Sequence, residues 1–118
     1  MMRGMKFEEI DEFEKDLKRL LKKYRTLSED LEIVRLDLTD EPGEHPPFSY
    51  RIEGLGITTC MIKVKKIACK AMKGKGINSG LRLIYAWFEE ESRIVFVELY
   101  YKGDKDIEDR DRIKKHYK

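Results

Sequence analysis

The chain has 118 residues, of which 41% are hydrophobic and 41% are charged, and its formal net charge is only +2. This length predicts a single domain over residues 1–118 with a modest core, with residues 1–4 as an optional leader before Met5. No apolar run is long enough to cross a bilayer, and the amino-terminal residues lack the apolar core of a signal peptide, so we expect a protein of the reducing cytoplasm.

The first third of the chain has the pattern of one strand followed by two helices. Residues 6–10 fit a short strand, and apolar residues then recur at helical spacing over residues 12–25. A second apolar stripe follows the N-cap candidate Ser28 and ends before Pro42 and Gly43. Because only two or three residues separate the two helices, we predict an antiparallel helical hairpin.

The second part of the chain has the pattern of strands. Residues 40–49 hold three prolines and a glycine, which is typical of a loop. Residues 65–73 fit either a helix or a strand with a bulge, and the neighbouring strands favour a strand. A charged tail over about residues 106–118 is expected to be a solvated C-terminal helix. The expected strands lie near residues 50–53, 62–65, 81–88 and 93–101.

The order of these elements predicts an α+β fold. The layout is β-α-α-β-β-β-α, in which the N-terminal helical hairpin packs on one face of a twisted antiparallel β-sheet. The other face of the sheet must then be covered or functional.

Positive charge is concentrated in one internal segment. Residues 55–88 contain seven Lys or Arg residues and no Asp or Glu, whereas the segments before and after it are slightly acidic. Such a patch creates a local field even when the net charge is small. From the residues alone, a binding surface and an ordinary solvated basic face are both open interpretations.

Familiar catalytic and metal-binding patterns are missing from the sequence. Cys60 and Cys69 form no CxxC pair, and His45 and His116 are remote from them in sequence, so we expect neither a zinc site nor another metal. The Gly74–Gly76 stretch lacks the spacing of a phosphate-binding P-loop. We therefore predict no cofactor.

The basic segment suits the cleavage of RNA by its own 2′-hydroxyl. This reaction requires in-line geometry, positive charge near the phosphorane, a base for the 2′-hydroxyl and an acid for the leaving oxygen. A lysine among other cations can act as a base, arginine offers a planar fork to phosphate, and tyrosines can stack on unpaired bases. For Arg82, the alternative is a structural ion pair with Glu98 on a neighbouring strand.

Several blocks together resemble the RelE/ParE superfamily of toxins from type II toxin–antitoxin systems, closest to its RelE- and HigB-like branch. The resemblance runs from about Met5 to about Asp106. Its matching blocks are KFEEIDEFEKDLKRLLKKYRTLSEDLE, IKVKK, KGKGINSGLRLIY and VFVELYYKGDK. It implies a helical hairpin against a twisted antiparallel sheet, and a metal-independent, ribosome-dependent mRNA endoribonuclease (an mRNA interferase) that inhibits translation. It also implies the ribosome, mRNA and a cognate antitoxin as partners, with no membrane partner.

The resemblance assigns roles to individual positions. Arg82 falls on the family's arginine that contacts phosphate at the cleavage site. Lys66 and Lys70 are added because a helix over residues 65–73 would place them on one side with Lys73. The catalytic candidates are Arg82, Lys73, Lys75, Tyr101 and Lys102. The candidates for RNA binding are Lys63, Lys65, Lys66 and Lys70.

The chain departs from the family pattern after its last strand. Gly103 stands where RelE-like members carry an arginine, and the late catalytic tyrosine or histidine has no fixed counterpart. The candidates for it are Tyr100, Tyr101, His116 and Tyr117. Two alternatives therefore stay open: a non-enzymatic ParE-like inhibitor of DNA gyrase, and a catalytically silent module that binds RNA or antitoxin.

Overall fold

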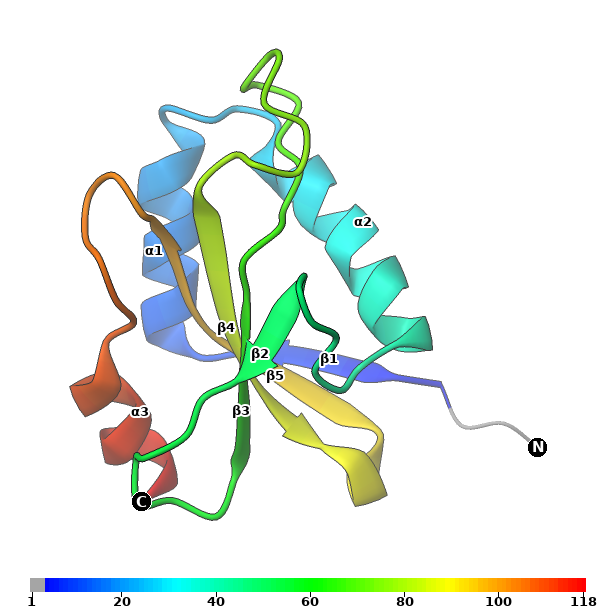
Figure 1. Ribbon diagram of the computed structural model, residues 1–118, viewed down its shortest axis with the longest axis vertical. Coiled ribbons are helices and arrows are strands. Elements are labelled where there is room, and N and C mark those ends of the chain that lie inside the picture. The colour runs from blue at the N-terminus through cyan, green and yellow to red at the C-terminus, as the bar shows by residue number, and fades with distance from the viewer. Residues whose placement is uncertain (1–3) are drawn as a thin grey trace.

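A five-stranded sheet organises residues 4–118, which this computed structural model describes (Figure 1). Of the expected leader, residues 1–3 lie outside the described residues. The strands are β1 (Lys6–Glu9), β2 (Ser49–Arg51), β3 (Cys60–Val64), β4 (Leu81–Phe88) and β5 (Arg93–Tyr101). The helices are α1 (Asp11–Leu21), α2 (Leu27–Asp40) and α3 (Arg110–Tyr117), and a short 3₁₀ turn, η1 (Glu89–Glu91), links β4 to β5.

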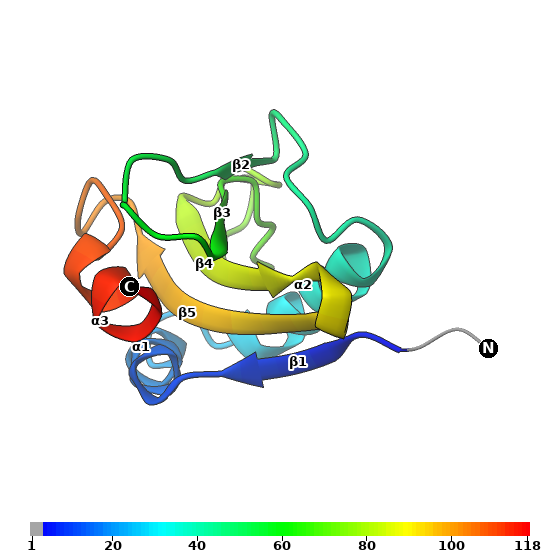
Figure 2. The same ribbon diagram turned by 90° about the horizontal axis from the view of Figure 1, so that it is seen from below.

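The strand order is β1-β5-β4-β3-β2, as Figure 2 shows from below. The pairs β2–β3, β3–β4 and β4–β5 are antiparallel, whereas β1 pairs with β5 in parallel. The α+β class with an N-terminal helical hairpin is confirmed. The sheet is therefore mixed rather than purely antiparallel. Because α1 follows β1 at once, β1 cannot pair with the next strand in a hairpin. It pairs instead with the free edge of β5. The five strands lie at the five ranges expected from the sequence, although the order β-α-α-β-β-β-α counts only four.

Alternating residues of β4 divide the core between the two faces of the sheet. Leu83 and Tyr85 pack with the buried residues of α1 and α2. Ile84 and Ala86 point to the opposite face, where Ile113 of α3 joins them. The hydroxyl of Tyr85 donates to the carbonyl of Pro42 at 2.6 Å, and burial raises the pKa of Tyr85. The second face is thus covered by α3 and by the connection between β2 and β3, from which Leu55 joins the same cluster.

The connection from β3 to β4 is a loop. The strand favoured for residues 65–73 is wrong, because the backbone of Lys70 and Ala71 bonds to side chains at the start of α2 instead of to a neighbouring strand. The backbone N–H of Lys70 donates to Asp30, and that of Ala71 donates to Thr26. A single isolated bridge joins Ile67 to Asn78.

A bulge in β5 changes which side chains face α3. The β4–β5 register pairs Ile84 with Glu98 and Tyr85 with Phe96, so Val97 is an extra residue. Such a bulge re-aims the side chains that follow it. The carboxylate of Glu98 is buried, accepts from the backbone N–H of Asp109 at 2.7 Å and pairs with Lys105.

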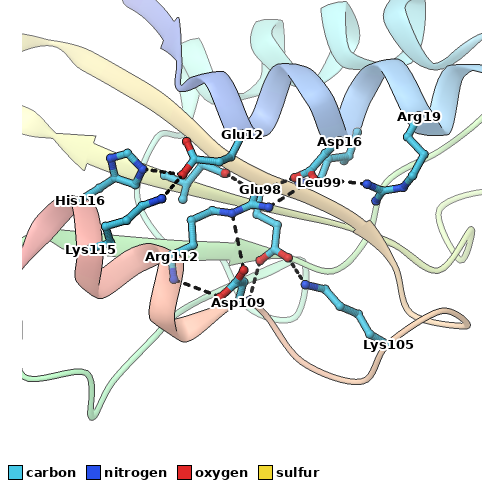
Figure 3. A network of polar contacts seen from close by, with 11 residues as sticks. Glu12, Asp16, Arg19, Glu98, Leu99, Lys105, Asp109, Arg112, Lys115 and His116 are labelled. Carbon is cyan, nitrogen blue, oxygen red and sulfur yellow. Dashed lines mark hydrogen bonds and ion pairs between the residues drawn. The ribbon is translucent and has the colours of Figure 1, made fainter.

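Buried ion pairs fasten the C-terminal helix to the rest of the molecule (Figure 3). Asp16 of α1 accepts from Arg112 at 2.7 Å and from the backbone N–H of Leu99 at 3.1 Å. Asp109 caps α3 by accepting from the backbone N–H of Arg112 at 3.0 Å. The expected C-terminal helix is confirmed, and it is anchored through Ile113, which is fully buried.

Acid is expected to weaken one contact between α1 and α3. Glu12 lies 2.6 Å from the ammonium of Lys115 and 2.9 Å from the imidazole of His116. The hydrogen bond from Lys115 first, and then that from His116, lower the pKa of Glu12 from 4.5 to about 2. Because the folded-state pKa is the lower one, the contact stabilises the fold above pH 4.5, and this stabilisation is lost as the pH falls towards 2.

This expectation can be checked by thermal unfolding of the wild type and of Glu12→Gln across that pH range at constant ionic strength. The difference in Tm between the two proteins should be largest above pH 4.5 and should close as Glu12 becomes protonated. A difference that stays constant with pH would show that the carboxylate charge does not stabilise the contact.

Candidate functional site

A pocket of about 280 Å³ lies at the end of the sheet where β4 begins and where β3 and β5 end. No Asp or Glu is among its lining residues. Its charged and aromatic lining consists of Lys65, Lys66, Lys75, Arg82, Lys102 and Tyr101. So many cations without a carboxylate create a positive field, which favours an anionic ligand. We call this cavity the basic pocket.

Arg82 is held in place by backbone carbonyls. Its Nη1 donates to the carbonyl of Lys65 at 2.8 Å and, at 3.4 Å, to that of Leu81. The alternative ion pair with Glu98 is wrong, because Glu98 is engaged by Lys105 and by the backbone of Asp109. The two carbonyls fix the plane of the guanidinium without neutralising its charge. Its other N–H groups have no hydrogen-bond partner among the described residues, so they are available to phosphate oxygens.

The lysines of the basic pocket come from three different segments. Lys65 follows β3 and its ammonium lies 5.1 Å from the centre of the Tyr50 ring. Lys66 donates to the side chain of Asn78 at 2.8 Å, which ties the two ends of the β3–β4 loop together. Lys102 follows β5, and its backbone N–H donates to the carbonyl of Gly80 at 2.8 Å. Residues distant in sequence thus meet at one place.

Three of the sequence-predicted lysines lie outside the basic pocket. Lys63 forms a largely buried ion pair with Glu108 at 2.8 Å. Burial works against the charge of Lys63, but its interactions with Glu108 and Tyr100 together outweigh burial, so the pKa of Lys63 is raised. Lys70 lies 3.8 Å from Glu29 on the surface, and Lys73 is exposed on the loop. Because Lys63 is paired with Glu108, its role is to anchor the C-terminal segment.

Among the candidates for the late catalytic residue, only Tyr101 lines the basic pocket. Tyr100 points to the other side, where it is buried, and burial raises its pKa. Its hydroxyl has no hydrogen-bond partner among the residues that the structure describes. On α3, His116 contacts Glu12 and Tyr117 packs against aromatic neighbours. Neither of these two lines the basic pocket.

Sequence reasoning missed the residues that position the loop. Thr26 donates to the carboxylate of Asp30 at 2.8 Å, and both side chains then accept from the loop backbone. Ser79 donates to the carbonyl of Ile67 at 2.5 Å, which closes the base of the loop. The i, i+4 spacing of Thr26 and Asp30 could have indicated that these two side chains contact each other. It could not have indicated that they also bind the backbone of Lys70 and Ala71, which lie about forty residues further along the chain.

Comparison with known proteins rests on the fold. No family model and no curated protein matches the sequence. A metal-bound toxin from Helicobacter pylori is 23% identical and superposes with a TM-score of 0.58, over 85% of this chain and 97% of that one. A copper-bound mutant toxin from the same organism is 17% identical, with a TM-score of 0.54 over the same shares of both chains. The chain has the fold of these toxins.

The two Helicobacter pylori toxins are metal-bound. Within residues 4–118, no group of three or more His, Cys, Asp or Glu side chains is placed to hold a metal ion. The two histidines lie apart: His45 is 3.4 Å from Glu41, and His116 contacts Glu12. The prediction that no metal is required stays a prediction.

No described helix of the chain has the length and apolar character needed to span a membrane.

Proposed function

We propose that this protein is the toxin of a toxin–antitoxin system and that it cleaves mRNA on the ribosome in the cytoplasm. The observation that carries the proposal is the basic pocket, in which Arg82 is oriented by two carbonyls and no carboxylate competes with a phosphate. The fold shared with the Helicobacter pylori toxins and the resemblance to RelE- and HigB-like toxins support the same reading. A cognate antitoxin is the partner that this role requires.

The proposed reaction uses the RNA strand's own nucleophile. The 2′-oxygen attacks the adjacent phosphorus and loses its proton to a base, and the 5′-oxygen of the next nucleotide leaves with a proton from an acid. The products are a 2′,3′-cyclic phosphate and a 5′-hydroxyl. Arg82 stabilises the charge that develops on the phosphorane, with Lys65 and Lys102 beside it. Tyr101 and Lys75 are the side chains proposed for the proton transfers.

A second candidate function is a catalytically silent RNA-binding module. It is favoured by one observation: the basic pocket offers neither a carboxylate nor an imidazole for proton transfer, so lysines and Tyr101 would have to do all of it. This module would bind RNA in a salt-sensitive way, with each phosphate contact adding about 0.7 to the logarithmic salt slope on single strands.

Mapping of RNA 5′ ends after induction of the protein in cells would test the proposal. We expect new 5′-hydroxyl ends within translated messages, and none in a matched message whose start codon has been removed. Salt-sensitive RNA binding without new ends would favour the silent module. Intact messages together with a DNA-damage response would favour a gyrase inhibitor, and either result would overturn cleavage as the function.

A further inference from the structure

The two edges of the sheet differ in how their backbone groups are satisfied. At the β2 edge, the backbone N–H and carbonyl of Ser49 bond to the backbone of His45, at 3.0 and 3.3 Å. The backbone N–H of Arg51 donates to the carboxylate of Glu44 at 2.9 Å. The loop before β2 therefore occupies this edge, which is one way in which proteins protect a sheet from pairing with another chain.

The β1 edge has no such protection among the described residues. β1 is the outermost strand on its side of the sheet (Figure 2). The N–H groups of Lys6 and Ile10 donate towards β5, to carbonyls at 2.9 and 3.1 Å. Because alternate residues of β1 bond to β5, Phe7 and Glu9 direct their N–H and carbonyl groups away from it. Within residues 4–118 these outward groups have no hydrogen-bond partner.

The same short strand carries opposite charges on one face. Lys6 and Glu8 are two residues apart and therefore share a face of β1. Lys6 is exposed and forms no ion pair with a described carboxylate. The guanidinium of Arg93 lies 3.0 Å from Glu8 and 3.1 Å from Glu91, so two carboxylates share one cation. The edge thus holds an unmatched positive charge beside a surplus of negative charge.

We propose that the β1 edge is a homodimer interface, in which β1 pairs antiparallel with β1 of a second copy about a twofold axis at Phe7. In this register Phe7 forms a hydrogen-bonded pair with the partner subunit's Phe7, and Lys6 faces the partner subunit's Glu8. The twofold axis repeats this ion pair, because both copies use the same patch. The inference goes beyond the proposed function, since no residue that lines the basic pocket lies in β1.

Charge selects this register over its neighbours. Moving the twofold axis to Lys6, Glu8 or Glu9 would place two like charges directly opposite each other, which is destabilising. The axis at Phe7 instead brings two aromatic rings together, beside Phe96, whose ring centre lies 6.0 Å from that of Phe7. Because β1 has only four residues, the interface is small, and we expect a weak, reversible dimer.

Exchange of charge between copies tests the interface. Lys6→Glu places carboxylates at both positions of the proposed ion pair, and Glu8→Lys places ammonium groups at both. Each variant alone should therefore dimerise about tenfold more weakly than the wild type. An equimolar mixture of the two should recover nearly the wild-type affinity, because each ion pair of the mixed dimer again joins opposite charges. Sedimentation velocity over a concentration series, at low and constant salt, measures the affinity.

A proline in β1 tests the backbone contacts separately and keeps the test decisive if a charge variant folds poorly. Glu9→Pro removes an N–H that points away from β5, so the sheet within each copy is kept. The dimer would lose the bond from this N–H to the carbonyl of the partner subunit's Met5. The matched control is Glu9→Ala, which removes the same carboxylate but retains the N–H. Glu9→Ala should dimerise like the wild type, and Glu9→Pro at least about tenfold more weakly.

The outcomes separate this inference from the proposed function. A wild type that stays monomeric throughout the concentration series, or a mixture that dimerises no better than its two components, would overturn the homodimer. Equal dimerisation of Glu9→Pro and Glu9→Ala would overturn it as well, because the pairing would then not use the backbone of β1. RNA cleavage in cells should persist in all of these variants. A dimer with the expected behaviour and no cleavage would overturn the proposed function and retain the interface.

Discussion

Arg82→Ala is expected to slow RNA cleavage by at least ~10²-fold, the loss typical of removing one preorganised group that stabilises transition-state charge. The reason is geometric: the carbonyls of Lys65 and Leu81 fix the guanidinium before the substrate arrives. Arg82→Lys keeps the charge but lacks the planar fork, so it should recover only part of the rate. The rate should be measured in single turnover on ribosomes programmed with a defined message.

Arg51→Ala is the matched control for this measurement. Arg51 is an exposed arginine of β2 that does not line the basic pocket, and its guanidinium is 3.7 Å from Glu53. Its replacement should leave the single-turnover rate close to that of the wild type. A rate for Arg82→Ala within a few-fold of the Arg51→Ala rate would remove Arg82 from the proposed mechanism.

Asp16→Ala is expected to destabilise the fold by about 3–5 kcal/mol, the range measured when one partner of a buried ion pair is removed. Asp16 and Arg112 are both largely buried, with side-chain exposures of 7% and 14%. The substitution would leave the guanidinium of Arg112 with only the more distant carboxylate of Asp109, at 3.7 Å, and the backbone N–H of Leu99 without its acceptor. Denaturant-induced unfolding, with the slope m compared between variants, measures the change.

Two further variants complete this experiment. Asp37→Ala removes an exposed carboxylate from α2 and should change the free energy of unfolding by less than about 0.5 kcal/mol. Asp16→Ala combined with Arg112→Ala should be less destabilising than the sum of the two single changes, because the second removes the uncompensated charge. Strict additivity in this double-mutant cycle would show that the two side chains do not stabilise each other.

The helical hairpin and the two long strands could be predicted because each has its own local signal. The stripe that includes Phe13 and Leu20 repeats at helical spacing, and both residues are buried against the sheet. The parallel pairing of β1 could not be predicted, since it depends on a partner more than eighty residues away. The strand predicted for residues 65–73 is wrong because the prediction rested on the neighbouring strands, whereas the side chains of Thr26 and Asp30 accept hydrogen bonds from the backbone of this segment.

The candidate site was only partly accessible from the sequence. Charge density pointed to the segment that supplies Arg82, Lys75 and Lys65, which all line the basic pocket. Charge alone could not show that Lys65 lines the pocket whereas Lys63 does not. Lys63 is paired with Glu108, which belongs to the C-terminal segment. Gly103 could be noted as a departure from the family pattern, but its contact with Tyr101 exists only in three dimensions.

The place of β5 in the sheet sets the order in which a newly synthesised chain can fold. β1 is made before its sheet neighbour, residues 93–96, so it stays unpaired until those residues have been synthesised. The basic pocket likewise needs Tyr101 and Lys102, which are synthesised after Lys65, Lys75 and Arg82. Contacts between residues so far apart in sequence form late and slowly. A complete basic pocket can therefore form only after residues 101–103 have been synthesised.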